Sequence, residues 1–197
     1  MRKFGGALMG DIYEVIPTLE NESFLLREID LDRDLNDLLK VYSDENAVPF
    51  FNSDNCHGDN FYYKTIDRMK QAIDFWNLEY QKKYYVRMTI EDKSTHTAIG
   101  TIELFNRKAD DYYNNCGLLR LDLRSDYEIE KHIINILNII IPKTRELFGC
   151  DKIATKAIST AKNRISALKK CGFQPSDHFL IGFDGTKYDS YYIMELK

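Results

Sequence analysis

The sequence lacks an excess of basic residues and a long apolar run, and each absence excludes a class of function. The 197 residues include 27 lysine and arginine residues against 31 aspartate and glutamate residues, so the formal net charge is -4. This balance does not favour a nucleic-acid partner. The most apolar segment, residues 133–141, contains two asparagines and is much shorter than the roughly 18–20 apolar residues of a membrane-spanning helix. We therefore expect neither nucleic acid nor membrane as a partner.

Cysteine is also sparse, and its distribution bears on metal binding and location. The four cysteines are scattered, with no CxxC pair and no histidine at zinc spacing. We therefore predict no metal site and reduced thiols, with a disulfide or metal framework left open. The N-terminus shows no apolar signal segment. These features together predict a cytoplasmic protein.

The sequence predicts one domain, residues 17–197, preceded by a short extension, residues 1–16. Residues 1–16 include Gly5, Gly6 and Gly10, which discourage regular structure, so we expect a mobile N-terminal extension there. Residues 17–197 show no linker, internal repeat or low-complexity tract that divides them. A chain of this length and hydrophobic content buries a substantial core.

Hydrophobic periodicity predicts helices and strands in the order β-α-α-β-β-β-α-β-α-β-β. Asp30 to Asp34 offer caps for the first helix, and Asp184-Gly185 is a hairpin turn. The expected strands are 23–28, 84–90, 99–105, 117–123, 152–158, 179–183 and 188–196, and a helix spans 61–82. The fold class is α/β (α+β), a mixed, mostly antiparallel sheet of about seven strands flanked by about four helices. The long loop at residues 43–60 is a candidate functional segment.

The stretch from Gly117 to Phe173 carries the strongest family signal. It runs strand, polar turn, apolar helix, strand, short helix and Gly172-Phe173. This order resembles the cofactor half of the GNAT-type N-acetyltransferases. The tail Ala167-Leu168-Lys169-Lys170-Cys171-Gly172-Phe173 is similar to the Leu-x-Lys-x-Gly-Phe ending of the fourth helix in the ribosomal-protein N-terminal acetyltransferase branch. Asn163 matches an upstream family asparagine if two residues are deleted from the helix, and the tyrosine acid of many family members is Leu168 here.

The resemblance implies acetyl-CoA as co-substrate, with its pyrophosphate at the start of the third helix, where a family loop [Arg/Gln]-x-x-Gly-x-[Gly/Ala] supplies backbone N–H groups. In this chain the first position is Glu128. The two glycine positions fall on Lys131 and on either Ile129 or Ile133, and no glycine lies between Gly117 and Gly149. We expect Lys131 and His132 to supply cationic contacts in place of the glycine backbone, against repulsion from Glu128 and Glu130. The predicted cofactor-binding residues are Leu121, Leu123, Glu128, Lys131, His132, Ile133 and Asn163.

The candidate catalytic residues are two strand carboxylates. Glu103 lies on the strand that faces the acceptor in the family, and through water it would accept a proton from the attacking amine. Asp122 is the second candidate. For both, a solvent-facing carboxylate without a catalytic role remains open.

The resemblance implies an acetyl-CoA-dependent N-acetyltransferase in which a primary amine attacks the thioester directly. The acceptor, a small-molecule amine or a peptide N-terminus, is left open, as is a homodimer. Two alternatives remain: a GNAT-fold protein without coenzyme binding that acts as a binding module or partner subunit, and an enzyme using another acyl donor.

Two structural expectations follow. The strand ending at Leu123 and the strand starting at Lys152 should splay apart to admit the pantetheine arm, whose amides would pair with free backbone groups. Pro142 should bend or end the apolar helix, because proline lacks an N–H and its ring crowds the carbonyl of Asn138. A further turn would then close at Gly149.

Overall fold

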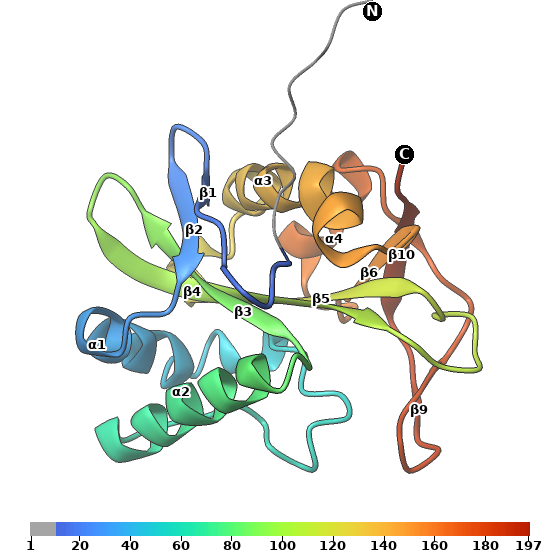
Figure 1. The fold of residues 1–197 in the computed structure, drawn as a ribbon. Coiled ribbons are helices and arrows are strands. Elements are labelled where there is room, and N and C mark those ends of the chain that lie inside the picture. Colours follow the sequence, from blue (N-terminus) through green and yellow to red (C-terminus); the bar gives the residue numbers. More distant parts are fainter. Residues whose placement is uncertain (1–10) are drawn as a thin grey trace, which may run out of the picture.

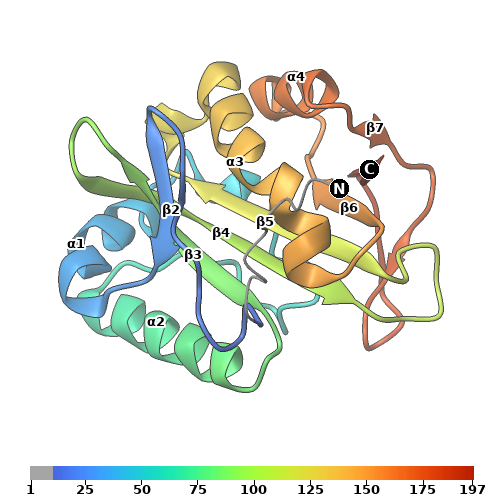
Figure 2. The same cartoon turned by 45° about the horizontal axis from the view of Figure 1, so that its top comes forward.

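Residues 11–197, which the computed structural model describes, form a twisted sheet with helices on both faces (Figure 1). Helices α1 and α2 cover one face, and α3 and α4 cover the other (Figures 1 and 2). The elements, including the 3-10 turns η1 and η2, are β1 (Leu19–Glu20), β2 (Phe24–Glu28), α1 (Leu31–Tyr42), η1 (Val48–Phe50), α2 (Ile66–Gln81), β3 (Val86–Asp92), β4 (Thr97–Arg107), β5 (Cys116–Leu123), η2 (Ser125–Tyr127), α3 (Glu130–Phe148), β6 (Lys152–Lys156), α4 (Lys162–Lys170), β7 (Gln174–Pro175), β8 (Leu180–Ile181), β9 (Lys187–Tyr188) and β10 (Tyr191–Glu195).

The main sheet confirms the predicted fold class. Its eight strands have the order β1-β2-β3-β4-β5-β6-β10-β7. Every neighbouring pair is antiparallel except β5 and β6, which run parallel. The parallel pair is joined through α3, as a crossover connection requires. The central parallel pair is where the chain departs from simple antiparallel pairing.

Local capping fixes the beginning of the first two helices. The Asp30 side chain accepts hydrogen bonds from the N–H groups of Asp32 and Arg33, as a cap at the start of α1. Helix α2 begins later than the predicted Phe61, because Thr65 caps it by accepting from the N–H of Arg68. Phe61 itself has a φ of 61°, which is incompatible with a right-handed helix.

Pro142 was predicted to bend or end the apolar helix; an end there is wrong, and a bend stays a prediction. Helix α3 runs from Glu130 to Phe148 with Pro142 inside it, and Gly149 closes it in the left-handed conformation. The buried face of α3 includes Ile136, Ile140 and Phe148, so the apolar face continues on both sides of the proline. Burial of that face offsets the hydrogen bond that proline removes.

The C-terminal strands also differ from the prediction. Only Leu180–Ile181 and Lys187–Tyr188 pair around the Asp184-Gly185 turn, as a separate two-stranded ribbon. The expected strand 188–196 is interrupted at Ser190, whose φ is 65°, and resumes as β10 within the main sheet. The ribbon is therefore not part of the main sheet, and Arg107 and Asp111 hold it through the backbone of Ile181.

Part of the expected N-terminal extension packs on the domain. Ile12 is 2% exposed and belongs to the core under α3. Its carbonyl accepts a hydrogen bond from the Tyr80 hydroxyl at 3.0 Å. Residues 1–10 of that expected extension lie outside the described residues, and the boundary at residue 16 stays a prediction.

Candidate active site

Strands β5 and β6 separate partway along their length. Their pairing runs from Cys116 and Lys152 only to Leu119 and Thr155. Strand β5 nevertheless stays paired with β4 as far as Leu123. The predicted splay is therefore confirmed, and residues 120–123 have no β6 partner.

In the splayed part of β5, the side chains of Arg120 and Asp122 are already bonded to Glu103 and Arg87, which leaves backbone groups to face an incoming ligand. Leu121 and Leu123 are 3% and 1% exposed, and both belong to the core on the α3 side. Their contribution to cofactor binding can therefore come only from main-chain groups. Unpaired backbone groups of this kind need a hydrogen-bond partner, which an extended amide-containing ligand provides.

The first turn of α3 follows the splay directly. Its N-cap residue, Ile129, makes no side-chain capping bond. An uncapped helix start presents free N–H groups and the positive end of the helix dipole. The local geometry of a pyrophosphate-binding helix start is thus present, although the family's glycines are absent.

The expectation that Glu128 and Glu130 leave repulsive charge beside this turn is wrong. Glu128 is 8% exposed, and its two carboxylate oxygens accept from Nε and Nη2 of Arg164, each at 2.7 Å. Glu130 forms an ion pair with Lys170 at 2.5 Å and accepts a hydrogen bond from Ser166. The hydrogen bonds from Lys170 and Ser166 lower the pKa of Glu130. Helix α4 therefore neutralises both carboxylates.

The remaining predicted cofactor residues have different surroundings. Ile133 is fully buried in the core, and the Asn163 side chain donates to the Glu128 carbonyl at 2.9 Å. The His132 ring packs against Phe24 and Tyr127, with ring centroids 5.6 and 5.3 Å away. Lys131 is exposed. Among the predicted stand-ins, Lys131 is the cation best placed for an incoming ligand, and the binding roles stay predictions.

The two predicted catalytic carboxylates lie in one buried cluster on the opposite face of the sheet. Glu103 and Asp122 are 1% and 0% exposed, so neither faces solvent. Arg87 joins them, with Nη2 2.6 Å from Glu103 Oε2 and Nη1 3.0 Å from Asp122 Oδ2. A second arginine, Arg120, pairs with Glu103 at 2.5 Å. The Tyr42 hydroxyl donates to Asp122 at 2.9 Å.

Sequence reasoning missed Arg87, Arg120 and Tyr42, although one signal was available. Arg87, Glu103 and Arg120 stand directly opposite one another on β3, β4 and β5. Cross-strand neighbours of opposite charge on one face interact. The strand alternation was visible in the sequence, but the register that aligns these three residues was not.

The cluster sets the protonation of its carboxyl groups in opposite directions. Burial acts to raise the pKa of Glu103, but Arg120 and Arg87 outweigh it and lower that pKa below its ordinary value. Burial raises the pKa of Asp122, and Arg87 and Tyr42 offset this only in part. Glu103 is therefore held ionised, which makes it a weak proton acceptor near neutral pH. The catalytic assignments of both residues stay predictions.

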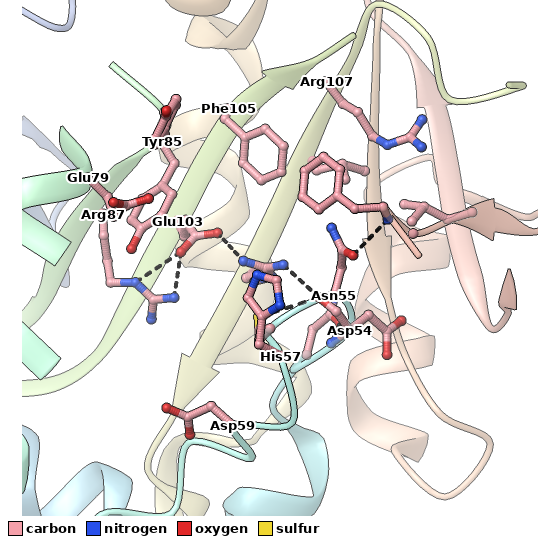
Figure 3. Close-up of a pocket in the computed structure, with 18 of the residues that line it drawn as sticks. Asp54, Asn55, His57, Asp59, Glu79, Tyr85, Arg87, Glu103, Phe105 and Arg107 are labelled. Atoms are coloured by element: carbon pink, nitrogen blue, oxygen red, sulfur yellow. Dashed lines mark hydrogen bonds and ion pairs between the residues drawn. The ribbon is translucent and has the colours of Figure 1, made fainter. Parts of the chain in front are cut away.

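A cavity of about 1270 Å³ opens on this face of the sheet (Figure 3). Its walls come from the loop before α2, from α2 itself, from β3, β4 and β5, and from the β8–β9 ribbon. Glu103, Arg87 and Arg120 line it, whereas Asp122 is not among the lining residues. Arg120 is also the first β5 residue beyond the last β5–β6 pair. The cavity and the splay therefore meet at Arg120.

Asp54, in the long loop predicted to be functional, connects the splayed strands. Its carbonyl accepts from Arg120 of β5 at 2.9 Å. Its carboxylate accepts from Lys156 of β6 at 2.6 Å and from the Tyr191 hydroxyl of β10 at 3.1 Å. One loop residue thus fastens three strands at the inner end of the cavity. No motif in the sequence indicated this role.

Two further properties concern the described residues alone. In residues 11–197, no group of three or more His, Cys, Asp or Glu side chains is placed to hold a metal ion. Within the same residues, no helix combines the length and apolar character needed to cross a membrane.

No protein-family model and no curated protein matches the sequence, but solved structures do. A putative ribosomal-protein-serine acetyltransferase from Vibrio cholerae superposes with a TM-score of 0.66 at 12% identity, covering 91% of this chain and 98% of its own. A GNAT-family acetyltransferase from Bacillus anthracis superposes with a TM-score of 0.67 at 10% identity, covering 91% of this chain and 98% of its own. The microcin C7 self-immunity acetyltransferase MccE, solved with acetyl-CoA and AMP, gives 0.65 at 16% identity, covering 89% and 93%. These likenesses confirm that the chain has the fold of the GNAT acetyltransferases, and the resemblance to the ribosomal-protein branch stays a prediction.

Proposed function

We propose that this chain, whose fold is that of the GNAT acetyltransferases, is an acetyl-CoA-dependent N-acetyltransferase acting on a primary amine. The observation that carries the proposal is the splay at Leu119 and Thr155, followed directly by the uncapped start of α3. The first feature suits the amides of a pantetheine arm, and the second suits a pyrophosphate. MccE, which has a similar fold, was solved with acetyl-CoA bound.

The charge distribution also supports coenzyme binding. The argument for a binding module without coenzyme is the absence of the family's glycines, and repulsion from Glu128 and Glu130 does not add to it, because both carboxylates are paired with cations. Lys131 remains exposed on the first turn of α3. An exposed ammonium group there offers a charge-assisted contact to phosphate. Another acyl-CoA as donor remains compatible with the same backbone surface.

In the proposed reaction, the amine enters from the cavity and meets the thioester at the splay near Arg120. The amine nitrogen bonds to the acetyl carbon and the carbon–sulfur bond breaks, so CoA leaves with the electron pair of that bond. The chain's contribution is positioning, together with a backbone N–H near Leu123 that polarises the carbonyl. We retain a cytoplasmic location as part of the proposal, with a homodimer left open.

The proposal is tested by titrating the purified chain with acetyl-CoA and with free CoA, using calorimetry and thermal shift. A ligand that binds only the native state raises the midpoint of unfolding. A saturable heat together with such a rise is the expected result. The absence of both would overturn the proposal and favour the binding module.

Lys131→Ala sharpens this test. Loss of one charge-assisted phosphate contact should weaken acetyl-CoA binding by about five- to a hundredfold and reduce its salt dependence. Lys143→Ala is the matched control, because Lys143 is an exposed lysine near the other end of α3. If both variants bind as wild type does, Lys131 has no role and the backbone alone holds the coenzyme.

A further inference from the structure

The carboxylates of the cavity are already occupied by the chain's own cations. Six carboxylates line it, and five of them form ion pairs; the sixth, Asp110, is exposed on the loop after β4. The pairs are Glu103 with Arg87 and Arg120, Asp54 with Lys156, Asp59 with Arg68, Glu79 with Lys82, and Asp111 with Arg107. A polycationic ligand would have to displace these internal partners, which is costly at the buried or half-buried pairs of Glu103, Asp54 and Asp111 and less so at the more exposed pairs of Asp59 and Glu79.

Aromatic surface is what the cavity offers to a ligand. Phe75, Tyr84 and Phe183 line it and are 54%, 61% and 90% exposed. Phe105 also lines the cavity (Figure 3). The deeper ring of Trp76 is instead covered by the Arg87 guanidinium, 4.4 Å from its centroid. The accessible rings therefore suit an aromatic or apolar body.

Two loop walls of the cavity are joined by a contact. The Phe183 N–H donates to Asn55 Oδ1 at 3.0 Å, which joins the β8–β9 ribbon to the loop before α2. A Cβ on Gly182 would lie 3.0 Å from the same Asn55 oxygen and 2.9 Å from the Tyr188 ring. This contact obstructs an extended chain more than a compact ligand at the place where ribbon and loop meet.

We propose that the acceptor is a small primary amine carried on an aromatic or otherwise apolar body, and not a polyamine. The proposal rests on the proposed function, because it names the acceptor of that reaction. The body packs against Phe75 and Phe105, and the amine lies toward Arg120, where the cavity meets the splay. The nitrogen–carbon bond forms as the carbon–sulfur bond breaks, and the proton released by the amine passes through solvent to the departing thiolate.

Trp76 provides a direct binding measurement without acetyl-CoA. It is the chain's one tryptophan, and it lines the cavity. Its fluorescence is followed while the full chain is titrated with 2-phenylethylamine and, separately, with spermidine. We expect saturation by 2-phenylethylamine at a concentration at least about tenfold lower than by spermidine, since an aromatic contact and an unbroken ion pair both favour the former. Equal or tighter binding of spermidine would overturn the proposal.

A pair of variants locates the ligand. Phe75→Ala should weaken 2-phenylethylamine binding by about two- to tenfold, while Phe179→Ala should leave it unchanged. The two phenylalanines are similarly exposed, at 54% and 49%, but only Phe75 lines the cavity. An unchanged affinity in Phe75→Ala, or equal losses in both variants, would contradict this placement. Tighter binding of a tetrapeptide with an N-terminal phenylalanine would overturn the choice of a small molecule.

A transfer assay separates this inference from the proposed function. Release of free CoA thiol is measured with acetyl-CoA and each amine. Thiol release with 2-phenylethylamine supports both proposals. Binding of 2-phenylethylamine without thiol release and without heat from acetyl-CoA overturns the transferase and leaves the ligand class intact, whereas the same result with acetyl-CoA bound overturns this amine class as the acceptor. Thiol release with spermidine alone overturns the ligand class and leaves the transferase intact.

Discussion

The surroundings of Glu103 decide what this residue can do. The sequence suggested a base that accepts a proton from the amine, or else a carboxylate facing solvent. Instead it is buried between Arg87 and Arg120, at 2.6 and 2.5 Å. A carboxylate held ionised by two guanidinium groups balances their charge at the cavity floor. Removing this carboxylate should therefore lower the stability of the fold.

Glu103→Gln should destabilise the chain by about 3–5 kcal/mol near neutral pH, because it leaves buried arginines without their partner. Since the folded pKa of Glu103 is below the ordinary 4.5, its ionised form contributes stability that is present above that value and lost as the pH falls through the lower folded pKa. The difference in the free energy of unfolding between Glu103→Gln and wild type should therefore become smaller at acidic pH. Urea unfolding at a series of pH values measures it.

Glu22→Gln serves as the control for this series, because Glu22 is exposed and surface substitutions usually change stability little. It should follow the wild-type curve throughout. If the free energy of unfolding of Glu103→Gln is lower than that of wild type by the same amount at every pH, the charge of Glu103 is not the cause of the destabilisation.

At the scale of elements, Arg164 connects α4 to the segment that begins α3. It is 2% exposed, and besides Glu128 it donates to the Phe50 carbonyl of η1 at 2.9 Å. Asn163 adds a bond to the Glu128 carbonyl. Side chains from α4 therefore fix the turn that leads into α3, at the position that the resemblance assigns to the start of the family loop.

Arg164→Met should cost about 3–5 kcal/mol, because it leaves the Glu128 carboxylate buried and unpaired. The double variant Arg164→Met/Glu128→Met should regain most of this loss, since well-packed apolar residues often replace a buried ion pair at little cost. Guanidinium unfolding measures both variants. A double variant as unstable as the single one would show that the bond to Phe50, not the ion pair, is what matters.

At the scale of the whole molecule, the cavity depends on contacts between distant parts of the chain. Asp54 ties its loop to β5, β6 and β10, and Asn55 ties the same loop to the β8–β9 ribbon. Neither tie involves neighbours in sequence. The shape of the cavity is thus a property of the assembled fold.

Asp54→Ala should loosen this assembly without unfolding it. Hydrogen exchange should quicken in residues 52–60 and at the β6 and β10 ends near Lys156 and Tyr191, because those side chains lose their common partner. Asp59→Ala is the matched control, since Asp59 lies in the same loop but bonds Arg68 and Tyr63. Equal protection at Lys156 and Tyr191 in Asp54→Ala and wild type would contradict a fastening role.

Local chemistry made several elements predictable. Asp30 caps α1 as its side chain suggested, and Gly149 ends α3 in the left-handed conformation that glycine favours. The splay was anticipated from the family resemblance. The prediction that α3 ends at Pro142 was wrong, because burial of the apolar face of α3 outweighs a local helix breaker. The last strand was predicted too long, because Ser190 interrupts it.

The sequence by itself determined the order of the main helices and strands, the Asp30 cap and the buried face of α3, because these depend on neighbours within a few residues of one another. Only the tertiary structure decided which charges are neutralised. Glu128 forms its ion pair with Arg164, which lies 36 residues away in the sequence, and Asp54 pairs with Lys156, which lies 102 residues away. Whether a carboxylate repels a ligand or balances a buried arginine depends on such contacts, and local periodicity carries no information about them.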